Sequence, residues 1–272
     1  MKRVLTAFLL APLVLALVIF GPKWLIFAVV AAVSMLAGWE FAGLAEKCGA
    51  NPPRVALLVG LAALFVGNYE WPDQTVVLLG GISVALLIYC TFRSPVERML
   101  ADATSVVFGL FYTGLTLLGL TTLRDESNGA SLLVFLLCAV WAGDIVALYV
   151  GRMWGRRKLA PSLSPNKTWA GAIGSVAGSV AVTGLLLALS NLLAQWNFAR
   201  VSFADETWWY WLVLAAVVNV AAQVGDLAES ALKRSAGVKD SGSLLPGHGG
   251  VLDRIDALLL AAPVLWYAQV IR

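Results

Sequence analysis

The sequence predicts an all-α polytopic membrane protein with about nine transmembrane helices. Of its 272 residues, 60% are hydrophobic and only 13% are charged, whereas soluble domains carry about 25% charged residues. Apolar segments close to the length that crosses a bilayer, about 20 residues, recur along the whole chain. The basic residues are also distributed unevenly, with successive loops alternately rich and poor in them. These three observations indicate that lipid surrounds most of the chain.

Nine segments are apolar enough to form helices that cross a membrane. They are residues 4–20, 24–43, 54–68, 75–92, 104–122, 130–150, 168–194, 207–225 and 255–271. The first resembles a signal peptide, but another apolar run begins a few residues later, which favours an uncleaved first helix. The third is short and contains glycines. Small residues in stretches such as AGAIGSVAGS predict close packing between helices.

The loop charges support this count and give an orientation. With the N-terminus in the cytoplasm, the inside segments contain 15 of the 19 basic residues. These are Lys2, Arg3, Lys47, Arg54, Arg93, Arg98, Arg152, Arg156, Arg157, Lys158, Lys167, Lys233, Arg234, Lys239 and Arg254. The outside segments contain Lys23, Arg124, Arg200 and Arg272. The positive-inside rule therefore predicts a cytoplasmic N-terminus and an outside C-terminus.

The polar chemistry is concentrated in the C-terminal part of the chain. We expect residues 1–103 to form a scaffold of transmembrane helices. We expect residues 104–272 to form the catalytic region, with two cytoplasmic loops at residues 151–167 and 226–256. The short outside loops contain little chemistry, so the sequence predicts an active site at the cytoplasmic face.

Asp144 lies inside the sixth apolar segment. A carboxylate at membrane depth is costly and usually faces a polar cavity and a partner. A run of cations follows it, from Arg152 to Lys158. Such a cluster can bind phosphates, or it can only hold anionic lipid head groups or fix the topology.

The stretch SPNKTW contains Ser164, Lys167 and Thr168 and precedes the seventh apolar segment. We expect residues 166–168 to open that helix, because Pro165 stops the preceding chain from continuing as helix. The N–H groups at a helix start, with Lys167 beside them, can bind a phosphate. Ser and Thr at such a position can instead serve only as helix caps.

The second polar region begins with Asp226, Glu229, Ser230 and Lys233, whose spacing places them on one face of a helix. A stabilising pair between Glu229 and Lys233 is the ordinary interpretation. Asp226, however, directly follows an apolar segment, where a solvated face is not expected. This position favours a functional site.

Asp253 and Asp256 share a face at the start of the last helix. Neighbouring carboxylates repel each other unless a cation or proton lies between them. With Asp226 they form a candidate site for a divalent ion, and oxygen ligands without a Cys/His pair indicate Mg²⁺ rather than Zn²⁺. Acidic residues that complement a helix dipole are the alternative. A second cation beside Mg²⁺ is left open.

Between these helices lies the glycine-rich stretch KDSGSLLPGHGG. Gly247, Gly249 and Gly250 allow close backbone approach, and such loops can hold phosphates with Lys239 supplying charge. His248 is the only histidine of the chain; it can bind phosphate, transfer a proton or support the loop. Carboxylates, cations and a glycine loop together indicate phosphoryl or nucleotidyl transfer on a lipid.

Residues 230–256, SALKRSAGVKDSGSLLPGHGGVLDRID, resemble the signature of the phosphatidate cytidylyltransferases, also called CDP-diacylglycerol synthases. The matching positions are Ser230, Lys233, Arg234, Lys239, Asp240, Gly242, Pro246, His248, Gly249, Gly250, Asp253, Arg254 and Asp256. The stretch LAPSLSPNKTW is similar to a loop of the same family. Asn166 and Ala170 depart from it, since the family usually has Lys and Glu there.

The resemblance implies that CTP and phosphatidic acid are converted to CDP-diacylglycerol and pyrophosphate. It implies a catalytic group of Asp226, Lys233, Lys239, Asp240, Asp253 and Asp256. It implies substrate contacts from Ser164, Lys167, Thr168, Ser230, Arg234, Gly247, His248, Gly249, Gly250 and Arg254. Mg²⁺ is then expected at Asp226 and Asp253, supported by Asp256 and Asp144.

Two other classes of function share some of these features. A lipid transporter or scramblase also contains intramembrane charge, but it tends to show internal repeats and charge at mid-membrane, which this sequence lacks. A nucleotidyltransferase that acts on another lipid phosphate is the second alternative. The modest net charge of +3 gives no reason to expect nucleic acid. We expect a protein of the bacterial inner membrane, and a homodimer is left open.

Overall fold

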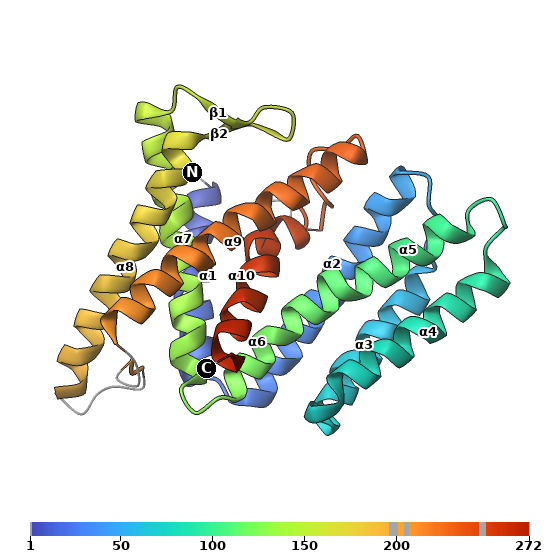
Figure 1. Ribbon diagram of the computed structural model, residues 1–272, viewed down its shortest axis with the longest axis horizontal. Coiled ribbons are helices and arrows are strands. Elements are labelled where there is room, and N and C mark those ends of the chain that lie inside the picture. Colours follow the sequence, from blue (N-terminus) through green and yellow to red (C-terminus); the bar gives the residue numbers. More distant parts are fainter. Residues whose placement is uncertain (1, 196–200, 204–206, 245–248, 272) are drawn as a thin grey trace. The chain divides into compact units, whose positions relative to one another are not determined.

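The computed structural model describes residues 2–195, 201–203, 207–244 and 249–271 (Figure 1). Helices make up most of this part of the chain. In chain order they are α1 (Lys2–Phe20), α2 (Lys23–Lys47), α3 (Arg54–Glu70), the 3₁₀ turn η1 (Pro72–Gln74), α4 (Thr75–Arg93), α5 (Met99–Gly109), the π-helical segment η2 (Leu110–Leu115), α6 (Thr116–Asp125), α7 (Gly129–Trp154), α8 (Trp169–Gln195), α9 (Trp208–Ser235) and α10 (Leu252–Val270). Two strands, β1 (Lys158–Ala160) and β2 (Ser164–Thr168), complete the fold.

A helix occurs at each of the nine apolar segments that the sequence predicts. Among the described residues, six helices are long and apolar enough to cross a membrane. They are Lys23–Lys47, Pro72–Arg93, Met99–Asp125, Gly129–Trp154, Trp169–Leu192 and Trp208–Ser235. The protein is therefore an integral membrane protein built of helices, whereas the count of nine spans stays a prediction.

The chain packs into two compact units. The first consists of residues 1–26, 119–230 and 256–272, and the second of residues 27–118 and 231–255. Four helices, α2, α6, α9 and α10, have residues in each unit, because the boundaries fall inside them.

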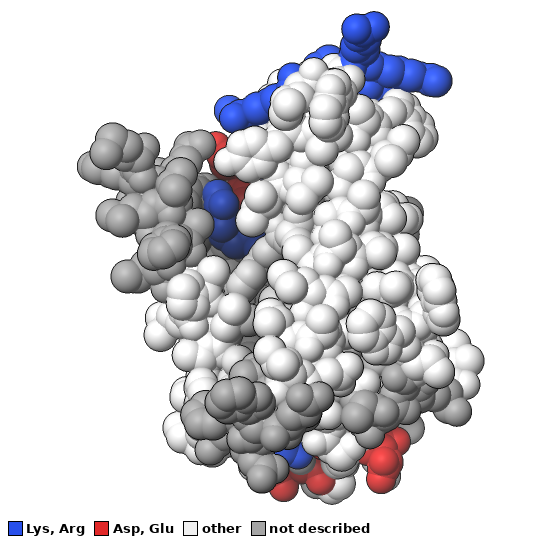
Figure 2. Space-filling model, turned by 90° about the vertical axis from the view of Figure 1, so that its left-hand side faces the viewer, with Lys and Arg blue, Asp and Glu red and all other residues white. Residues whose placement is uncertain are grey.

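In the first unit, α7 and α8 pack closely because glycines of α8 meet side chains of α7. A Cβ atom on Gly174 would lie 2.8 Å from Cβ of Val150, and one on Gly178 would lie 2.7 Å from Cβ of Val146. The small-residue stretch of the seventh segment thus packs as predicted. α8 has no charged residue. Figure 2 shows the side of the molecule where α8 lies, with basic side chains gathered at one end and mostly uncharged side chains below them.

The connection from α7 to α8 is an antiparallel hairpin of β1 and β2, drawn beside the ends of these helices in Figure 1. Lys158 pairs with Thr168, and Ala160 pairs with Ser164. Residues 166–168 therefore end a strand, and α8 begins only at Trp169. The prediction that they open the helix was wrong, because pairing with β1 keeps them extended. The fold is therefore helical, as predicted, with a short two-stranded hairpin that the sequence did not predict.

In the second unit, one face of α3 forms the core. Leu57, Leu61, Leu64 and Phe65 are buried at helical spacing. The π-helical segment packs against this face, since a Cβ on Gly114 would lie 2.7 Å from a methyl carbon of Leu61. The predicted fifth span is thus longer than expected and includes α5, η2 and α6.

α9 also extends beyond its predicted end at residue 225 and continues to Ser235. The four polar residues from Asp226 to Lys233 therefore lie on this helix, as their spacing predicted. The loop between the last two helices is shorter than expected and runs from residue 236 to residue 251.

Candidate active site

A cavity of about 640 Å³ lies within the first unit, between the hairpin and helices α7, α8 and α9. Its wall is formed by Asp144, Ala147, Leu148, Gly151, Arg152, Gly155, Lys158, Leu159, Asn166, Lys167, Thr168, Gly171, Ala172, Ser175, Gln223 and Asp226. Two carboxylates and three cations thus share one wall. This combination suits a ligand that has both phosphates and a bound cation.

Lys167 and Asp226 connect the hairpin to α9 across this cavity. The ammonium nitrogen of Lys167 lies 2.5 Å from Oδ2 of Asp226. The two side chains are 25% and 34% exposed, so both remain accessible to a ligand. Gly225, the preceding residue, allows α10 to approach α9, because a Cβ there would lie 2.6 Å from the carbonyl oxygen of Asp256.

Thr168 is the N-cap of α8. Its buried hydroxyl accepts a hydrogen bond of 3.1 Å from the N–H of Gly171. Of the two roles that the sequence left open for Thr168, phosphate binding and helix capping, the structure shows the capping contact. Ser164 lies at the other end of β2 and is outside the residues that line the cavity.

A network of two amides and one hydroxyl, from Asn219, Gln223 and Ser175, lies in and beside the wall of the cavity. Nε2 of Gln223 donates to Oδ1 of Asn219 at 2.8 Å and to the carbonyl oxygen of Ala172 at 3.2 Å. Nδ2 of Asn219 donates to Oγ of Ser175 at 3.1 Å. These contacts pair polar groups of α8 and α9 with one another. They also fix the side chain of Gln223 in the cavity wall.

The second group of predicted residues is centred on Asp253, at the start of α10 in the second unit. Oδ1 of Asp253 accepts a hydrogen bond of 2.6 Å from Lys233. Oδ2 accepts from the N–H of Gly250 at 2.8 Å, and from both the N–H and the hydroxyl of Ser241 at 2.9 Å. The Asp253 side chain is 9% exposed. Four donors thus surround one carboxylate.

These contacts determine the ionisation of Asp253. Burial alone raises the pKa of its carboxyl group, but the Lys233 ammonium and the donors of Gly250 and Ser241 outweigh that effect. The pKa is lowered from an ordinary value of 3.8 to about 2. Asp253 is therefore a carboxylate throughout the physiological range.

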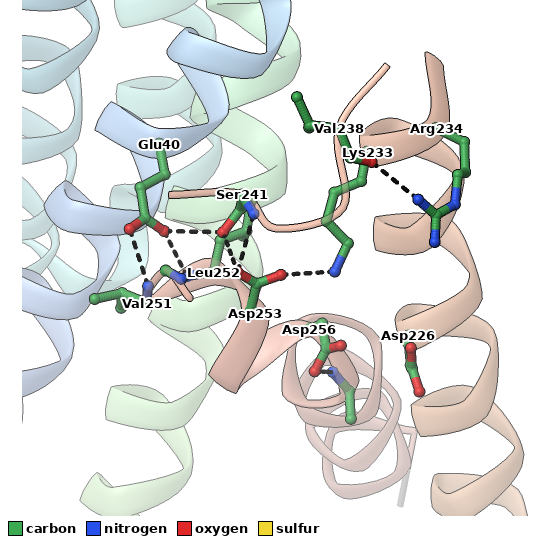
Figure 3. Close-up of polar contacts among 12 residues, drawn as sticks. Glu40, Asp226, Lys233, Arg234, Val238, Ser241, Val251, Leu252, Asp253 and Asp256 are labelled. Carbon is green, nitrogen blue, oxygen red and sulfur yellow. Dashed lines mark hydrogen bonds and ion pairs between the residues drawn. The ribbon is translucent and has the colours of Figure 1, made fainter. Parts of the chain in front are cut away.

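Glu40 of α2 binds the loop between α9 and α10, and Ser241 of this loop lies between the carboxylates of Glu40 and Asp253 (Figure 3). Its Oε1 accepts from the N–H of Val251 at 3.0 Å, and its Oε2 from the N–H of Leu252 at 2.8 Å. The hydroxyl of Ser241 lies 3.2 Å from Oε2. Sequence reasoning missed Glu40, although a carboxylate inside the apolar segment 24–43 was a signal that could have found it.

The glycines of this loop are required by the two carboxylates. Gly249 has φ +79°, and a Cβ there would lie 2.7 Å from Oδ2 of Asp253. A Cβ on Gly250 would overlap the Glu40 carboxylate and the Ser241 hydroxyl. Gly247 and His248 lie outside the described residues.

The remaining predicted residues lie on the surface or bind their own segment. Nη1 of Arg234 donates to the carbonyl oxygen of Val238 at 3.1 Å. Oδ1 of Asp256 accepts from the N–H of Ala257 at 2.8 Å. Ser230 is half-buried, and three other side chains are exposed, namely Lys239, Asp240 and Arg254.

The metal prediction can be compared with these positions. Within the part of the chain that the structure describes, no three His, Cys, Asp or Glu side chains are grouped so that they could hold a metal ion. Asp144 and Asp226 nevertheless line the same cavity. Mg²⁺ is commonly bound through one or two carboxylates together with water and substrate phosphates. The donors present therefore fit Mg²⁺ that binds with a phosphate-bearing substrate.

Several residues of the cavity were not among the predicted site residues. Arg152 and Lys158 were open to an alternative role in binding anionic lipid, yet both line the cavity. Asn219 and Gln223 precede Asp226 by seven and three positions on α9, so they share its helical face. That spacing was the signal that could have found them.

Comparisons with known proteins agree with the family that the sequence motif resembles. The chain matches the cytidylyltransferase family model over residues 1–271. A phosphatidate cytidylyltransferase of Brucella melitensis is 39% identical over 270 residues, which cover 97% of this chain and 91% of the relative. Proteins with the same name from Pseudomonas aeruginosa and Thermotoga maritima are each 35% identical, covering 98% and 96% of this chain and 97% and 93% of their own length. The chain therefore belongs to the cytidylyltransferase family.

Proposed function

We propose that this enzyme transfers the cytidylyl group of CTP to phosphatidic acid, giving CDP-diacylglycerol and pyrophosphate. The observation that carries the proposal is the cavity of the first unit, where Arg152, Lys158 and Lys167 lie with two carboxylates beside membrane-spanning helices. The relatives named phosphatidate cytidylyltransferase support the same reaction.

The reaction needs no nucleophile from the protein. A phosphate oxygen of phosphatidic acid attacks the α-phosphorus of CTP, and the bond from that phosphorus to the bridging oxygen of the β-phosphate breaks. Pyrophosphate leaves with the electron pair. Because both substrates are anions, the cations of Arg152, Lys158 and Lys167 reduce their repulsion and stabilise the leaving charge.

Asp226 and Asp144 would hold Mg²⁺ together with the phosphates of CTP, and coordination by Oδ2 of Asp226 would require its partner Lys167 to move. The ion would neutralise phosphate charge and orient the triphosphate. Asp253 and Asp256 stay predicted ligands. Since Lys233 binds Oδ1 of Asp253, direct coordination by that oxygen would require the lysine to move.

The membrane topology belongs to the same proposal. Nine spans, a cytoplasmic N-terminus and an outside C-terminus would place the cavity at the cytoplasmic face of a bacterial inner membrane, where CTP is available. Residues 1–103 would then be mainly scaffold, and residues 104–272 would contain the substrate cavity. The unequal distribution of basic residues between the loops supports this orientation.

Turnover by the purified protein tests the proposal. With CTP, phosphatidic acid and Mg²⁺ in detergent micelles, we expect equal amounts of pyrophosphate and CDP-diacylglycerol. The variant Lys167→Ala should lower kcat/KM by about 100-fold, the scale expected when one electrostatic stabiliser is lost. Lys23→Ala is the matched control, since Lys23 forms an exposed pair with Asp125 at 3.3 Å and should retain activity.

Two results would contradict the proposal. The wild-type protein could form no pyrophosphate, which would favour transport or another reaction. It could also use a different lipid phosphate faster than phosphatidic acid, which would assign the enzyme to another lipid.

A further inference from the structure

We propose that Glu40 is a positioning residue for this reaction, because it holds both ends of the glycine-rich loop and so fixes how Asp253 presents its carboxylate. This inference rests on the proposed cytidylyl transfer. Glu40 comes from α2, in the segment that the sequence assigned to scaffold. Its effect would reach the substrates through Asp253 and Lys233 rather than by direct contact.

Glu40 binds the loop on either side of residues 245–248. Before them, the hydroxyl of Ser241 lies 3.2 Å from Oε2 of Glu40. After them, the N–H groups of Val251 and Leu252 donate to the two carboxylate oxygens at 3.0 and 2.8 Å. These last two donors are at the start of α10, where helical N–H groups have no partner within the helix. Glu40 thus caps α10 from a different helix.

The cap determines the environment of Asp253, the second residue of α10. Three donors, from Gly250 and Ser241, converge on Oδ2 of Asp253, whereas Oδ1 faces Lys233. The Ser241 hydroxyl lies between the carboxylates of Asp253 and Glu40 and has one proton to donate. Any movement of Ser241 or of the start of α10 would therefore turn Asp253 and Lys233 away from their present positions.

The burial of Glu40 argues for more than a contribution to stability. Glu40 is only 7% exposed, and a buried carboxylate is costly unless donors surround it. Apolar replacements of buried charged groups are often neutral or stabilising. The loop is also shaped around this carboxylate, since a Cβ on Gly242 would lie 2.5 Å from Oε1 of Glu40.

The test compares Glu40→Gln with Asp102→Asn in the full-length protein. Asp102 is a suitable control because it is also buried in the second unit, being 1% exposed. It accepts from the N–H of Asn51 and the hydroxyl of Ser94, each at 2.6 Å, and neither of these donors belongs to the glycine-rich loop that holds Asp253. For each variant, kcat, KM for CTP and Tm are measured.

We expect both variants to lower Tm, because each loses one acceptor for a buried donor. Only Glu40→Gln should lower kcat, by about 10- to 100-fold as expected for a misplaced reacting group, with KM for CTP changed less than about threefold. Equal kcat values for Glu40→Gln and wild type would overturn the inference. Equal losses of kcat in the two variants would reduce Glu40 to a purely structural role and overturn it as well.

Ser241→Ala provides a second variant if Glu40→Gln does not fold. It removes only the hydroxyl between the two carboxylates, so the N–H contacts of Asp253 and Glu40 remain. We expect a smaller fall in kcat than for Glu40→Gln, and unchanged kcat would contradict the inference. Failure of the wild-type enzyme to turn over would instead contradict the proposed function.

Discussion

Asp253 and Lys233 form a more enclosed ion pair than Asp226 and Lys167, whose side chains are 34% and 25% exposed. The side chains of Asp253 and Lys233 are 9% and 14% exposed, and the nitrogen and oxygen lie 2.6 Å apart. A partner removed from such a pair leaves the other charge buried and uncompensated. The exposed pair of Lys23 and Asp125, with exposures of 55% and 67%, lacks this property. Enclosure rather than pair geometry therefore makes Asp253 sensitive to substitution.

Asp253→Asn should lower the free energy of unfolding near neutral pH by about 3 kcal/mol. Because folding lowers the pKa of Asp253 to about 2, its stabilising contribution is complete above the unfolded pKa near 4 and is lost as pH falls towards 2. The Tm difference between wild type and variant, measured in detergent, should be constant from pH 5 to 8 and should narrow below pH 4.

The exposed pair serves as the control for this measurement. Asp125→Asn should change Tm little at any of these pH values, because surface ion pairs contribute little. A Tm difference for Asp253→Asn that already changes between pH 5 and 7 would contradict the lowered pKa.

At the scale of elements, the backbone of the loop between α9 and α10 lies in close contact with two carboxylates. Glu40 and Asp253 both bind it, and Gly249 and Gly250 leave no room for side chains beside them. Hydrogen bonds to Glu40 thus link α2 to the start of α10 within the second unit. A methyl group in this loop should be more harmful than the same methyl group on an open helix.

Gly250→Ala should destabilise the protein by about 2 kcal/mol, the usual scale for an overpacked site, and should lower turnover. Gly80→Ala is the control, since Gly80 lies in α4 and a Cβ there would meet no atom within 4 Å. Alanine favours helix by up to about 1 kcal/mol over glycine, so this variant should be neutral or more stable. Thermal unfolding and turnover of the two proteins give the comparison, and similar behaviour would contradict the packing argument.

At the scale of the whole molecule, the membrane decides which surfaces are tolerated. Large apolar side chains such as Phe92, Ile173 and Trp209 are 87%, 69% and 77% exposed. Exposed apolar side chains recur along all six helices that are long enough to cross a membrane. The bilayer covers them, and the six helices that are long and apolar enough to cross it in the described part of the chain supply most of this surface.

The predicted topology places residue 48 inside and residue 73 outside, with α3 crossing between them. Cys48 is exposed, and Asp73 lies in the exposed turn η1. In a background with Cys90 and Cys138 replaced by Ser, a membrane-impermeant maleimide should label Cys48 only from the cytoplasmic side. After Cys48→Ser, the variant Asp73→Cys should be labelled only from outside.

This pair of positions tests whether α3 crosses the membrane. With 17 residues, α3 is not among the six helices that are long enough to do so. Labelling of both positions from the same side would show that α3 does not cross the membrane. The nine-span topology would then be wrong, even though the helix itself is present.

The sequence by itself determined what depends on local pattern. Apolar segments located the helices, and the spacing of Asp226, Glu229, Ser230 and Lys233 correctly predicted a helix there. Hydrophobicity and 3.6-residue periodicity are local properties, so they can be read without knowing the fold. The resemblance of residues 230–256 to a known signature then led to the family, which the comparisons confirmed.

Only the tertiary structure decided which partners these residues meet. Glu40 binds N–H groups 211 and 212 positions away, and Lys233 pairs with Asp253, 20 positions away. Residues 166–168 became strand because β1 pairs with them. Such contacts join segments far apart in the chain or depend on a partner strand. No periodicity records them, because the packing of the folded chain creates them.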